Sequence, residues 1–439
     1  MALELTGWQW RRVAGLALLV GCCAARGQSG AVLLPSGIAY DAAGNVYFAD
    51  VNRSQVFEAS LGGVLSVVAG SGVQGFGGDG GPATAAELNE PVAVAVGKDG
   101  TIYIADAGNA RVRAVAGGVI TTFAGNGVVG FAGDGGAATG AEFRRPVGLA
   151  VDASGAVLIC DRGNQRVRRV SAGVIATVAG DGVQGFAGDG GAAVAAELDS
   201  PEGVAVSADG RVFVADSHNA RIRVVGTDGV IATFAGTGVV GFSGDGGPAI
   251  AARLALPRGL VVDASGGLVF ADSNNERIRR IDAAGVMATL VGGGGEGKAG
   301  EGNGAAGTLM DSPRGVAVSS FGQAVFADSR NKLLRVLAAN GDLYAPAAMV
   351  GARTSTVVLT VPGTVVYGQM SAAVKVSGNA AVPMGNVALL DGGVSVGAGV
   401  LSAGSAVIAA SGLGVGTHSL TVAYAGDGVN PAAVSGASA

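Results

Sequence analysis

Apolar residues of this chain recur in short runs of about five, separated by turn residues. After Pro91 four such runs follow one another, over residues 92–96, 101–105, 111–115 and 119–124. Runs of this length, several with period-two alternation, are typical of β-strands. The pair Asp99-Gly100 between the first two runs is a strong hairpin signal. We therefore predict a four-stranded antiparallel sheet, with no helix long enough to connect parallel strands.

The same pattern returns at a fixed period. Its first run begins at a proline, and six prolines fall 56, 55, 55, 56 and 56 residues apart: Pro35, Pro91, Pro146, Pro201, Pro257 and Pro313. Such a period means that one unit of several strands is repeated, whereas the rungs of a linear β-solenoid are much shorter. A four-stranded sheet cannot bury both faces alone, and a radial array protects its edges. We predict an all-β chain with a six-bladed β-propeller.

The repeat ends after Asp342, and the residues that follow have a different sequence pattern. Short apolar runs recur at 356–361, 372–378, 386–393, 406–411 and 418–427. Their spacing predicts a small Ig-like β-sandwich. We assign 28–346 to the propeller, 347–353 to a linker and 354–439 to the sandwich, whose last strand is short or truncated. Residues 31–34 are candidates to complete the last blade.

Residues 1–27 have the features of a secretory signal peptide. Arg11 and Arg12 precede an apolar run, 13–23, that is too short to span a bilayer, and small residues precede Gln28. Leu19-Val20-Gly21-Cys22 also fits a bacterial lipobox, which would attach a lipid to Cys22. We predict an extracytoplasmic protein, secreted, periplasmic or at the cell surface, with lipid anchoring at Cys22 as the alternative. No other stretch looks transmembrane.

Composition narrows the classes of partner. The net charge is −5, so no basic excess is present to neutralise phosphates, and we exclude nucleic acid as a partner. The 80 glycines recur at fixed places between strand-like runs, which indicates turns in a folded chain. Removal of the signal peptide leaves Cys160 as the one cysteine, so no intrachain disulfide can form. Cys160 replaces an alanine of the other repeats, and we expect it to be buried.

Several short sequence motifs resemble those of a known family. G-N-V-Y-F-A-D at 44–50, the recurring D-x-x-N-x-R-(I/V)-R and an apolar strand ending in Ala-Gly resemble the NHL-repeat family, across residues 31 to about 345. The G-F-x-G-D-G-G loops resemble the long-loop repeats of exported bacterial proteins. This resemblance implies a propeller and leaves function open, because such propellers include binding, scaffolding and enzymatic members. The segment from Val382 resembles bacterial Ig-like repeats, which implies a structural role for His418.

Two repeated features are expected on one face of the propeller, and the first is the D-x-x-N-x-R hairpin. We expect its Asp and Asn to bond the turn backbone and its Arg to pair with the Asp. The alternative is a polar ring at the channel mouth that binds an anionic or polar ligand. The first and sixth copies depart from the motif. The candidate ligand-binding residues are Asp106, Asn109, Arg111, Asp161, Asn164, Arg166, Asp216, His218, Asn219, Arg221, Asp272, Asn275 and Arg277.

The second feature is a glycine-rich loop with one carboxylate, at Asp79, Asp134, Asp189 and Asp245. Such loops could bind Ca²⁺, but one Asp per loop is too few for a tight site. We favour a compact turn plugged by a phenylalanine: Phe76, Phe131, Phe186 or Phe242. We therefore predict no cofactor, with Ca²⁺ as the alternative. The G-x-G-x-x-G spacing in the same loops lacks the following helix that dinucleotide binding requires.

Histidine content bears on enzymatic function. The lyases that this fold resembles use histidines around the channel, and this chain has only His218 and His418. A zinc site needs three or four protein ligands. A carboxylate-based lactonase site stays open, although no acidic pair specific to one blade stands out. We predict an exported, non-enzymatic binding or scaffold protein with a protein or polysaccharide partner. The alternative is a propeller lyase or hydrolase with a central carboxylate or metal.

Overall fold

The computed structural model describes residues 34–60, 65–297, 305–319, 322–337, 343–344, 355–360, 370–378, 385–391, 394–402, 405–410, 420–424 and 433–434. The expected signal peptide, Cys22, residues 31–33, the linker and His418 lie outside these residues. The described residues divide into two compact units, one over 34–344 and the other over 355–434. None of the described helices is long and apolar enough to cross a bilayer.

The first unit holds six four-stranded antiparallel sheets in its described part, each with its strands in chain order. Sheet 1 comprises β1 (Pro35–Tyr40), β2 (Val46–Asp50), β3 (Gln55–Ala59) and β4 (Leu65–Ala69). Sheet 2 comprises β5 (Pro91–Val96), β6 (Ile102–Asp106), β7 (Arg111–Ala116) and β8 (Val119–Ala124). Sheet 3 comprises β9 (Pro146–Val151), β10 (Val157–Asp161), β11 (Arg166–Ser171) and β12 (Val174–Ala179).

The remaining three sheets repeat the same order. Sheet 4 comprises β13 (Pro201–Val206), β14 (Val212–Asp216), β15 (Arg221–Val225) and β16 (Ile231–Ala235). Sheet 5 comprises β17 (Pro257–Val262), β18 (Leu268–Asp272), β19 (Arg277–Ile281) and β20 (Met287–Val291). Sheet 6 comprises β21 (Pro313–Val318), β22 (Ala324–Asp328), β23 (Leu333–Leu337) and β24 (Leu343–Tyr344).

In the described residues, helix is limited to single 3₁₀ turns at two recurring places. One kind follows the second strand: η1 (Val51–Arg53), η3 (Ala107–Asn109), η5 (Arg162–Asn164), η7 (Ser217–Asn219) and η9 (Ser273–Asn275). The other kind closes the long loop before the next sheet: η2 (Ala83–Ala85), η4 (Ala138–Gly140), η6 (Ala193–Ala195), η8 (Ala249–Ala251) and η10 (Ala305–Gly307). No described helix could act as a crossover, as the sequence predicts.

The predicted strands of sheet 2 agree with the observed ones to within one residue at each end. The turn between β5 and β6 contains Gly100 at a φ of +83°, a conformation that favours glycine, as the Asp-Gly pair indicates. Apolar side chains from neighbouring sheets form the cores. Leu88, Val94, Ile104 and Ile120 of sheet 2 and its entering loop, for example, pack with Val56 of sheet 1.

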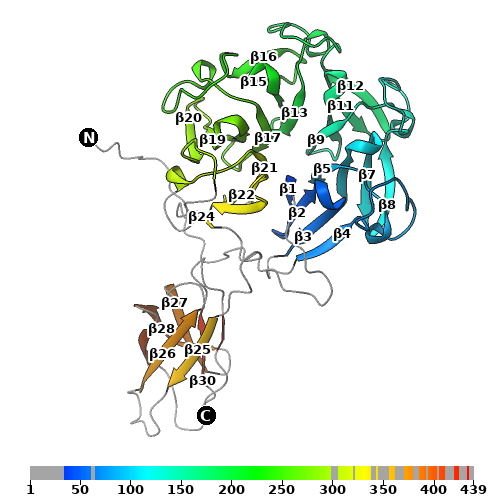
Figure 1. Cartoon of the computed structure of the whole chain (residues 1–439). Coiled ribbons are helices and arrows are strands. Elements are labelled where there is room, and N and C mark those ends of the chain that lie inside the picture. Colours follow the sequence, from blue (N-terminus) through cyan, green and yellow to red (C-terminus); the bar gives the residue numbers. More distant parts are fainter. Residues whose placement is uncertain are drawn as a thin grey trace. The chain divides into compact units, whose positions relative to one another are not determined.

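The first strands form a closed central ring, in which β1, β5, β9, β13, β17 and β21 each contact the next and β21 contacts β1 (Figure 1). These strands approach one another backbone to backbone. A Cβ on Gly203 would lie 2.2 Å from the carbonyl oxygen of Arg258, and one on Gly259 would lie 2.5 Å from that of Arg314. Glycine at the third position of the strand therefore permits the close packing of the ring.

The ring closes between sheets 6 and 1. The Ser329 hydroxyl donates to the Pro35 carbonyl at 2.6 Å, as Ser273 does to Pro313 between sheets 5 and 6 at 2.5 Å. The fourth strand of sheet 6 is β24, from the same repeat. Residues 31–33, which we considered for this position, lie outside the described part, so their role stays a prediction.

The second unit is a β-sandwich, as predicted. One sheet has the order β25 (Ser355–Thr360), β26 (Met370–Gly378) and β29 (Ser405–Ala410). The other has the order β28 (Val394–Leu401), β27 (Gly385–Asp391), β30 (Leu420–Tyr424) and β31 (Ala433–Val434). The sequence analysis missed β28, because its glycines and small residues weaken the strand signal. Val374, Leu389, Ile408, Val422 and Tyr424 lie in the core between the two sheets.

Candidate functional site

The repeated aspartate ends the second strand of every sheet and is fully buried. In sheet 2, Asp106 accepts the Asn89 backbone N–H at 2.7 Å and the Asn109 side-chain amide at 2.7 Å. Burial raises the pKa of the equivalent Asp161 and Asp216 to about 6, against the lowering effect of these hydrogen bonds. The aspartate thus fastens the end of the second strand to the loop that enters the first.

The repeated asparagine fastens the same turn to the preceding long loop. Asn109 donates to the Gly75 carbonyl at 2.7 Å, and Asn219 donates to the Gly185 carbonyl at 2.7 Å. Asn164 and Asn275 make the equivalent bonds to Gly130 and Gly241. The structure therefore brings the hairpin and the long loop together at one end of each sheet, as expected, and each set of site candidates is held within its own sheet and entering loop.

The expected pairing of Arg111 with Asp106 is wrong. The ion pair comes from Arg113, two residues further along β7, at 3.4 Å. Arg111 lies directly opposite Asp106 in the strand register, and its long side chain reaches past that residue to the carbonyls of Asn109 and Asn126. The later repeats show the same arrangement. There the second arginine of the motif forms the ion pair with the buried aspartate: Arg168, Arg223 or Arg279.

The loop phenylalanines are not buried plugs, which corrects the second expectation. Phe76, Phe131, Phe186 and Phe242 are 39–43% exposed. Each ring lies beneath the first arginine of the motif, with the guanidinium of Arg111 at 3.8 Å from the Phe76 ring centroid. A guanidinium is weakly hydrated and stacks well on an aromatic face, so this arrangement holds the ring at the surface.

The loop carboxylates serve the fold. Asp79 accepts two bonds from Arg113, the shorter at 2.6 Å, and one from the Thr122 hydroxyl at 2.6 Å. Asp134 and Asp189 are engaged in the same way. In the described part of the chain, no three His, Cys, Asp or Glu side chains are grouped as a metal ion requires. Ca²⁺ binding by these loops stays an untested alternative.

Two further candidates differ in accessibility. His218, in η7, is 42% exposed, and its Nδ1 lies 3.2 Å from Asp199 Oδ1. It is thus available at the candidate face. Cys160 is fully buried in β10, which confirms the predicted burial, and burial raises the pKa of its thiol.

Charged residues that break the repeat gather at one end of the central ring. The second position of the first strand is occupied in turn by Ser36, Val92, Val147, Glu202, Arg258 and Arg314. The start of each first strand pairs with the end of the second, as Pro201 does with Asp216, so the turns that follow the second strands lie at the same end. Arg162 in η5 and Arg330 after β22 belong to such turns.

Glu202 is shared by two arginines from neighbouring sheets. Its Oε1 lies 3.3 Å from Arg162 Nε and its Oε2 lies 2.9 Å from Arg258 Nε. Arg330 lies 3.8 Å from Asp311, a long contact. We call Arg162, Arg258, Arg314 and Arg330, with Glu202, the arginine cluster.

Arg314 has no carboxylate of its own among the described residues. Its Nε is buried without a hydrogen-bond partner. Burial, followed by repulsion from Arg258, lowers the pKa of Arg314 to about 10, and Arg330 and Arg145 act in the same direction. Glu202 is the acidic group that acts against them. The cluster is therefore an incompletely neutralised set of guanidiniums.

Sequence reasoning missed this cluster because it looked for features common to the repeats. A usable signal was present at the positions where the repeats differ. The second position of the first strand changes from serine or valine to glutamate and then to arginine in the last two repeats. The ring places this position near its axis. Packing alone does not explain a charged residue there, because charged side chains are rarely buried without a partner.

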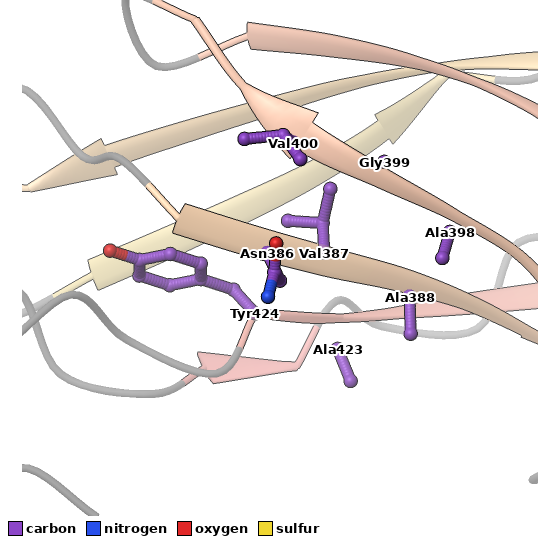
Figure 2. Close-up of a pocket in the computed structure, with 8 residues that line it drawn as sticks. All are labelled: Asn386, Val387, Ala388, Ala398, Gly399, Val400, Ala423 and Tyr424. Carbon is purple, nitrogen blue, oxygen red and sulfur yellow. The ribbon is translucent and has the colours of Figure 1, made fainter. Parts of the chain in front are cut away.

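A pocket in the sandwich offers little chemistry. It is lined by Asn386, Val387, Ala388, Ala398, Gly399, Val400, Ala423 and Tyr424. Figure 2 shows mostly small aliphatic side chains on the three strands, with the Asn386 amide and the Tyr424 hydroxyl as the polar side-chain groups. No acid, base or nucleophile of catalytic type lines it.

The chain matches two family models. The model for the SMP-30/gluconolactonase/LRE-like region covers residues 34–292, and that for the bacterial Ig-like domain (group 3) covers residues 357–439. Among curated proteins, the chloroplastic protein Suppressor of Quenching 1 of Arabidopsis thaliana is 30% identical over 266 residues, and mouse Teneurin-1 is 31% identical over 276. The matches cover 56% and 54% of this chain, and 25% and 10% of those proteins.

Solved structures support the propeller. A Bacteroides thetaiotaomicron protein of unknown function superposes with a TM-score of 0.52 at 16% identity, with 70% of each chain covered. An auxiliary nutrient binding protein of Bacteroides ovatus superposes with a TM-score of 0.50 at 11% identity, with 72% of this chain and 70% of that chain covered. At such identities the likeness concerns the fold.

Proposed function

The chain belongs to the SMP-30/gluconolactonase/LRE-like family, and we propose that it is an exported, non-enzymatic binding protein that presents one end of its propeller to a polysaccharide or protein partner. The family includes enzymes by name, so the proposal depends on the site. The repeated hairpins that we compare with the NHL family supply the framework of this end, because their polar groups bond to the long loops.

The observation that carries the proposal is the arginine cluster. Charged side chains that break the repeat come from sheets 3 to 6 and gather at one end of the central ring. Residues needed only for architecture recur in each sheet, as the buried aspartate does. Groups present once, and gathered in space, are more consistent with recognition of one ligand.

The same end carries exposed apolar side chains. Val129 and Val240, in the long loops, are among the exposed large hydrophobic residues, and Val240 is 67% exposed. Val129 stands two residues before Phe131, and Val240 stands two residues before Phe242. Exposed apolar groups rimmed by polar ones are typical of interaction surfaces. The long loops thus add exposed apolar surface at the end of the sheets that carries the arginine cluster.

Binding to purified polysaccharides tests the proposal. The full chain is offered to an array of neutral and acidic bacterial polysaccharides, beside Val240→Asp and, as a matched control, Val407→Asp on the sandwich, where Val407 is 73% exposed. We expect at least one polysaccharide to bind and Val240→Asp to weaken it at least fivefold, with Val407→Asp unchanged. Failure of every polysaccharide and of protein partners, or equal effects of both variants, contradicts the proposal.

For the alternative, a lyase or hydrolase, Glu202 is the carboxylate at the second position of the described first strands. Both of its oxygens lie against arginines, which favours an ion pair rather than a free general base. Calorimetric unfolding with EDTA, Ca²⁺ and Zn²⁺ tests a metal-dependent form. A site filled at a hundredfold over its dissociation constant adds about 2.7 kcal/mol. A shift with one metal supports the alternative, and identical transitions count against it.

Export also belongs to the proposal. Expression of the full sequence in a bacterium and mass spectrometry of the extracytoplasmic product test it. A chain that begins at Gln28 supports the secreted form, and a lipid on Cys22 supports the anchored form. Retention of the intact chain in the cytoplasm contradicts both.

A further inference from the structure

The guanidiniums of the arginine cluster outnumber the carboxylates that face them. Glu202 alone serves Arg162 and Arg258. Arg314 forms no ion pair with a described residue, and its buried Nε lacks a hydrogen-bond partner. Charged side chains placed partly out of water are costly unless an opposite charge accompanies them. The cluster is therefore arranged to accept an anion beside Arg314.

Glu202 orients two arginine side chains of the cluster. It lies in β13 between Arg162 of sheet 3 and Arg258 of sheet 5, and each of its oxygens faces one of them. This pairing holds the Arg258 side chain on β17, and β17 packs directly against β21, the strand that carries Arg314. Arg330, in the turn after β22, provides a further guanidinium near Arg314. Arginine presents a planar fork of donors that matches a carboxylate in a bidentate manner.

The charge of the whole chain limits the kind of anion. The net charge is −5, so an extended polyanion such as nucleic acid meets an unfavourable field away from the cluster. A ligand with a single negative group, or with widely spaced ones, meets less of this repulsion. At the same end of the sheets, the Phe131, Phe186 and Phe242 rings are partly exposed although an arginine stacks on each, and the exposed part of an aromatic ring is a surface of the type that sugar rings contact.

We propose that the arginine cluster binds the carboxylate of an acidic saccharide, such as a uronic acid residue, with Arg314 and Arg258 as the contacting groups. This inference rests on the proposed binding function and names its ligand class. Glu202 is a positioning residue for Arg258. Arg330 contributes from the rim of the site.

Isothermal titration of the full chain with galacturonate and with galactose isolates the carboxylate, because the two sugars differ at C6. We expect galacturonate to bind and galactose to bind at least tenfold more weakly. Increasing NaCl weakens the galacturonate affinity, since the attraction is electrostatic. Equal affinity for the two sugars, or no binding of galacturonate or oligogalacturonate, overturns the inference.

Variants of Arg314 test whether its guanidinium contacts the carboxylate of galacturonate. Arg314→Gln removes the charge and should weaken galacturonate at least tenfold, and Arg314→Lys should retain part of the affinity because it keeps the charge without the fork. The control is Arg211→Gln, since Arg211 pairs with Asp209 in the hairpin at the opposite end of sheet 4. Arg330→Gln, at an exposed turn position, provides a second test if Arg314→Gln does not fold. Unchanged affinity in the folded cluster variants overturns the assignment.

Further ligands separate this inference from the proposed function. Stronger binding of inorganic phosphate or poly-glutamate than of galacturonate shows an anion site of another class and overturns the saccharide assignment. Binding of a neutral polysaccharide that Val240→Asp weakens and Arg314→Gln leaves unchanged retains the proposed function and rejects the arginine site. Galacturonate binding without any polysaccharide or protein partner retains the site and rejects the proposed function.

Discussion

At the scale of single residues, the position that follows η9 shows how the protein accommodates a buried carboxylate. Glu276 has a φ of +52° and accepts the Ser312 backbone N–H at 2.6 Å. Gln165, with a φ of +54°, accepts the Ser200 backbone N–H at 2.7 Å in the equivalent place of sheet 3. Gln165 provides the same acceptor as Glu276 without the charge, so the hydrogen bond does not depend on the charge.

Glu276→Gln should therefore stabilise the propeller at alkaline pH. Burial raises the pKa of Glu276 to about 7, so the wild type loses stability as pH rises from about 4.5 through 7, while the glutamine variant does not. We expect a gain of about 1–3 kcal/mol at pH 8 and none at pH 4.5. Urea unfolding at both pH values measures it. An equal difference at the two pH values would contradict the electrostatic cause.

A second residue-scale contrast lies in sheet 1. Sheets 3 and 5 pair Asp152 with Arg169 at 2.6 Å and Asp263 with Arg280 at 2.7 Å. Sheet 1 has Glu58 at the arginine position, facing Asp41. Burial and then Asp41 raise the pKa of Glu58. Two carboxylates thus stand where other sheets have an ion pair.

Glu58→Arg should install that pair and raise the unfolding free energy by about 1 kcal/mol. The raised pKa means that the penalty of Glu58 grows as pH increases through its folded-state value, so the gain should be greater at neutral than at acid pH. Glu58→Gln is the control, because it removes repulsion without adding a cation, and it should show a smaller gain. A lower melting temperature for Glu58→Arg at pH 7 would count against this account.

At the scale of elements, one buried arginine connects each long loop to its sheet. Arg223 is fully buried and contacts Asp216 at 3.4 Å, Asp189 at 2.6 Å and the Ala187 carbonyl at 3.2 Å. Such an arginine bonds two carboxylates and a loop carbonyl at once. The loop between neighbouring sheets is thereby fixed without a core of its own.

Arg223→Met should destabilise the propeller by about 3–5 kcal/mol, because it leaves the buried Asp216 without its cation. The matched control is Arg221→Met, two residues away, where the lost groups are carbonyl bonds and a stacking contact with Phe186. That variant should cost about 1 kcal/mol. Thermal unfolding compares the two, and similar losses would show that the buried pair is not the main connection.

At the scale of the whole propeller, one junction joins sheets that do not follow one another in sequence. This is the junction between sheet 6 and sheet 1, which we call the seam. Its Ser329–Pro35 hydrogen bond equals the Ser217–Pro257 and Ser273–Pro313 bonds in length to within 0.1 Å. The seam therefore uses the same contact as interior junctions. A covalent loop keeps sheets 5 and 6 together, and no such loop joins sheets 6 and 1.

Ser329→Ala should open the seam more than Ser273→Ala opens the junction of sheets 5 and 6. Each variant loses one buried hydrogen bond, which costs about 1–3 kcal/mol. Local opening is easier where no loop holds the partners together. Hydrogen exchange should quicken in β1 and β22 of Ser329→Ala, with a smaller change in β18 and β21 of Ser273→Ala. Equal exchange in the two variants would argue against a weak seam.

The sequence by itself determined the elements and their repetition. Strand alternation, Asp-Gly turns and the spacing of the six prolines are local properties, so β5 to β8 and the sandwich class could be predicted from them. It also indicated that the repeated Asp and Asn belong to the turn. The choice between Arg111 and Arg113 required the reach of each side chain, which the register alone did not provide.

Only the tertiary structure decided where the distinctive chemistry lies. Arg162, Glu202, Arg258 and Arg314 belong to four different repeats, and each looks like a single substitution in its own strand or turn. The closed ring of first strands brings these positions to one end. The distances within the cluster depend on that ring rather than on neighbours in sequence. A local pattern specifies a strand, whereas a site assembled across sheets depends on how the sheets pack.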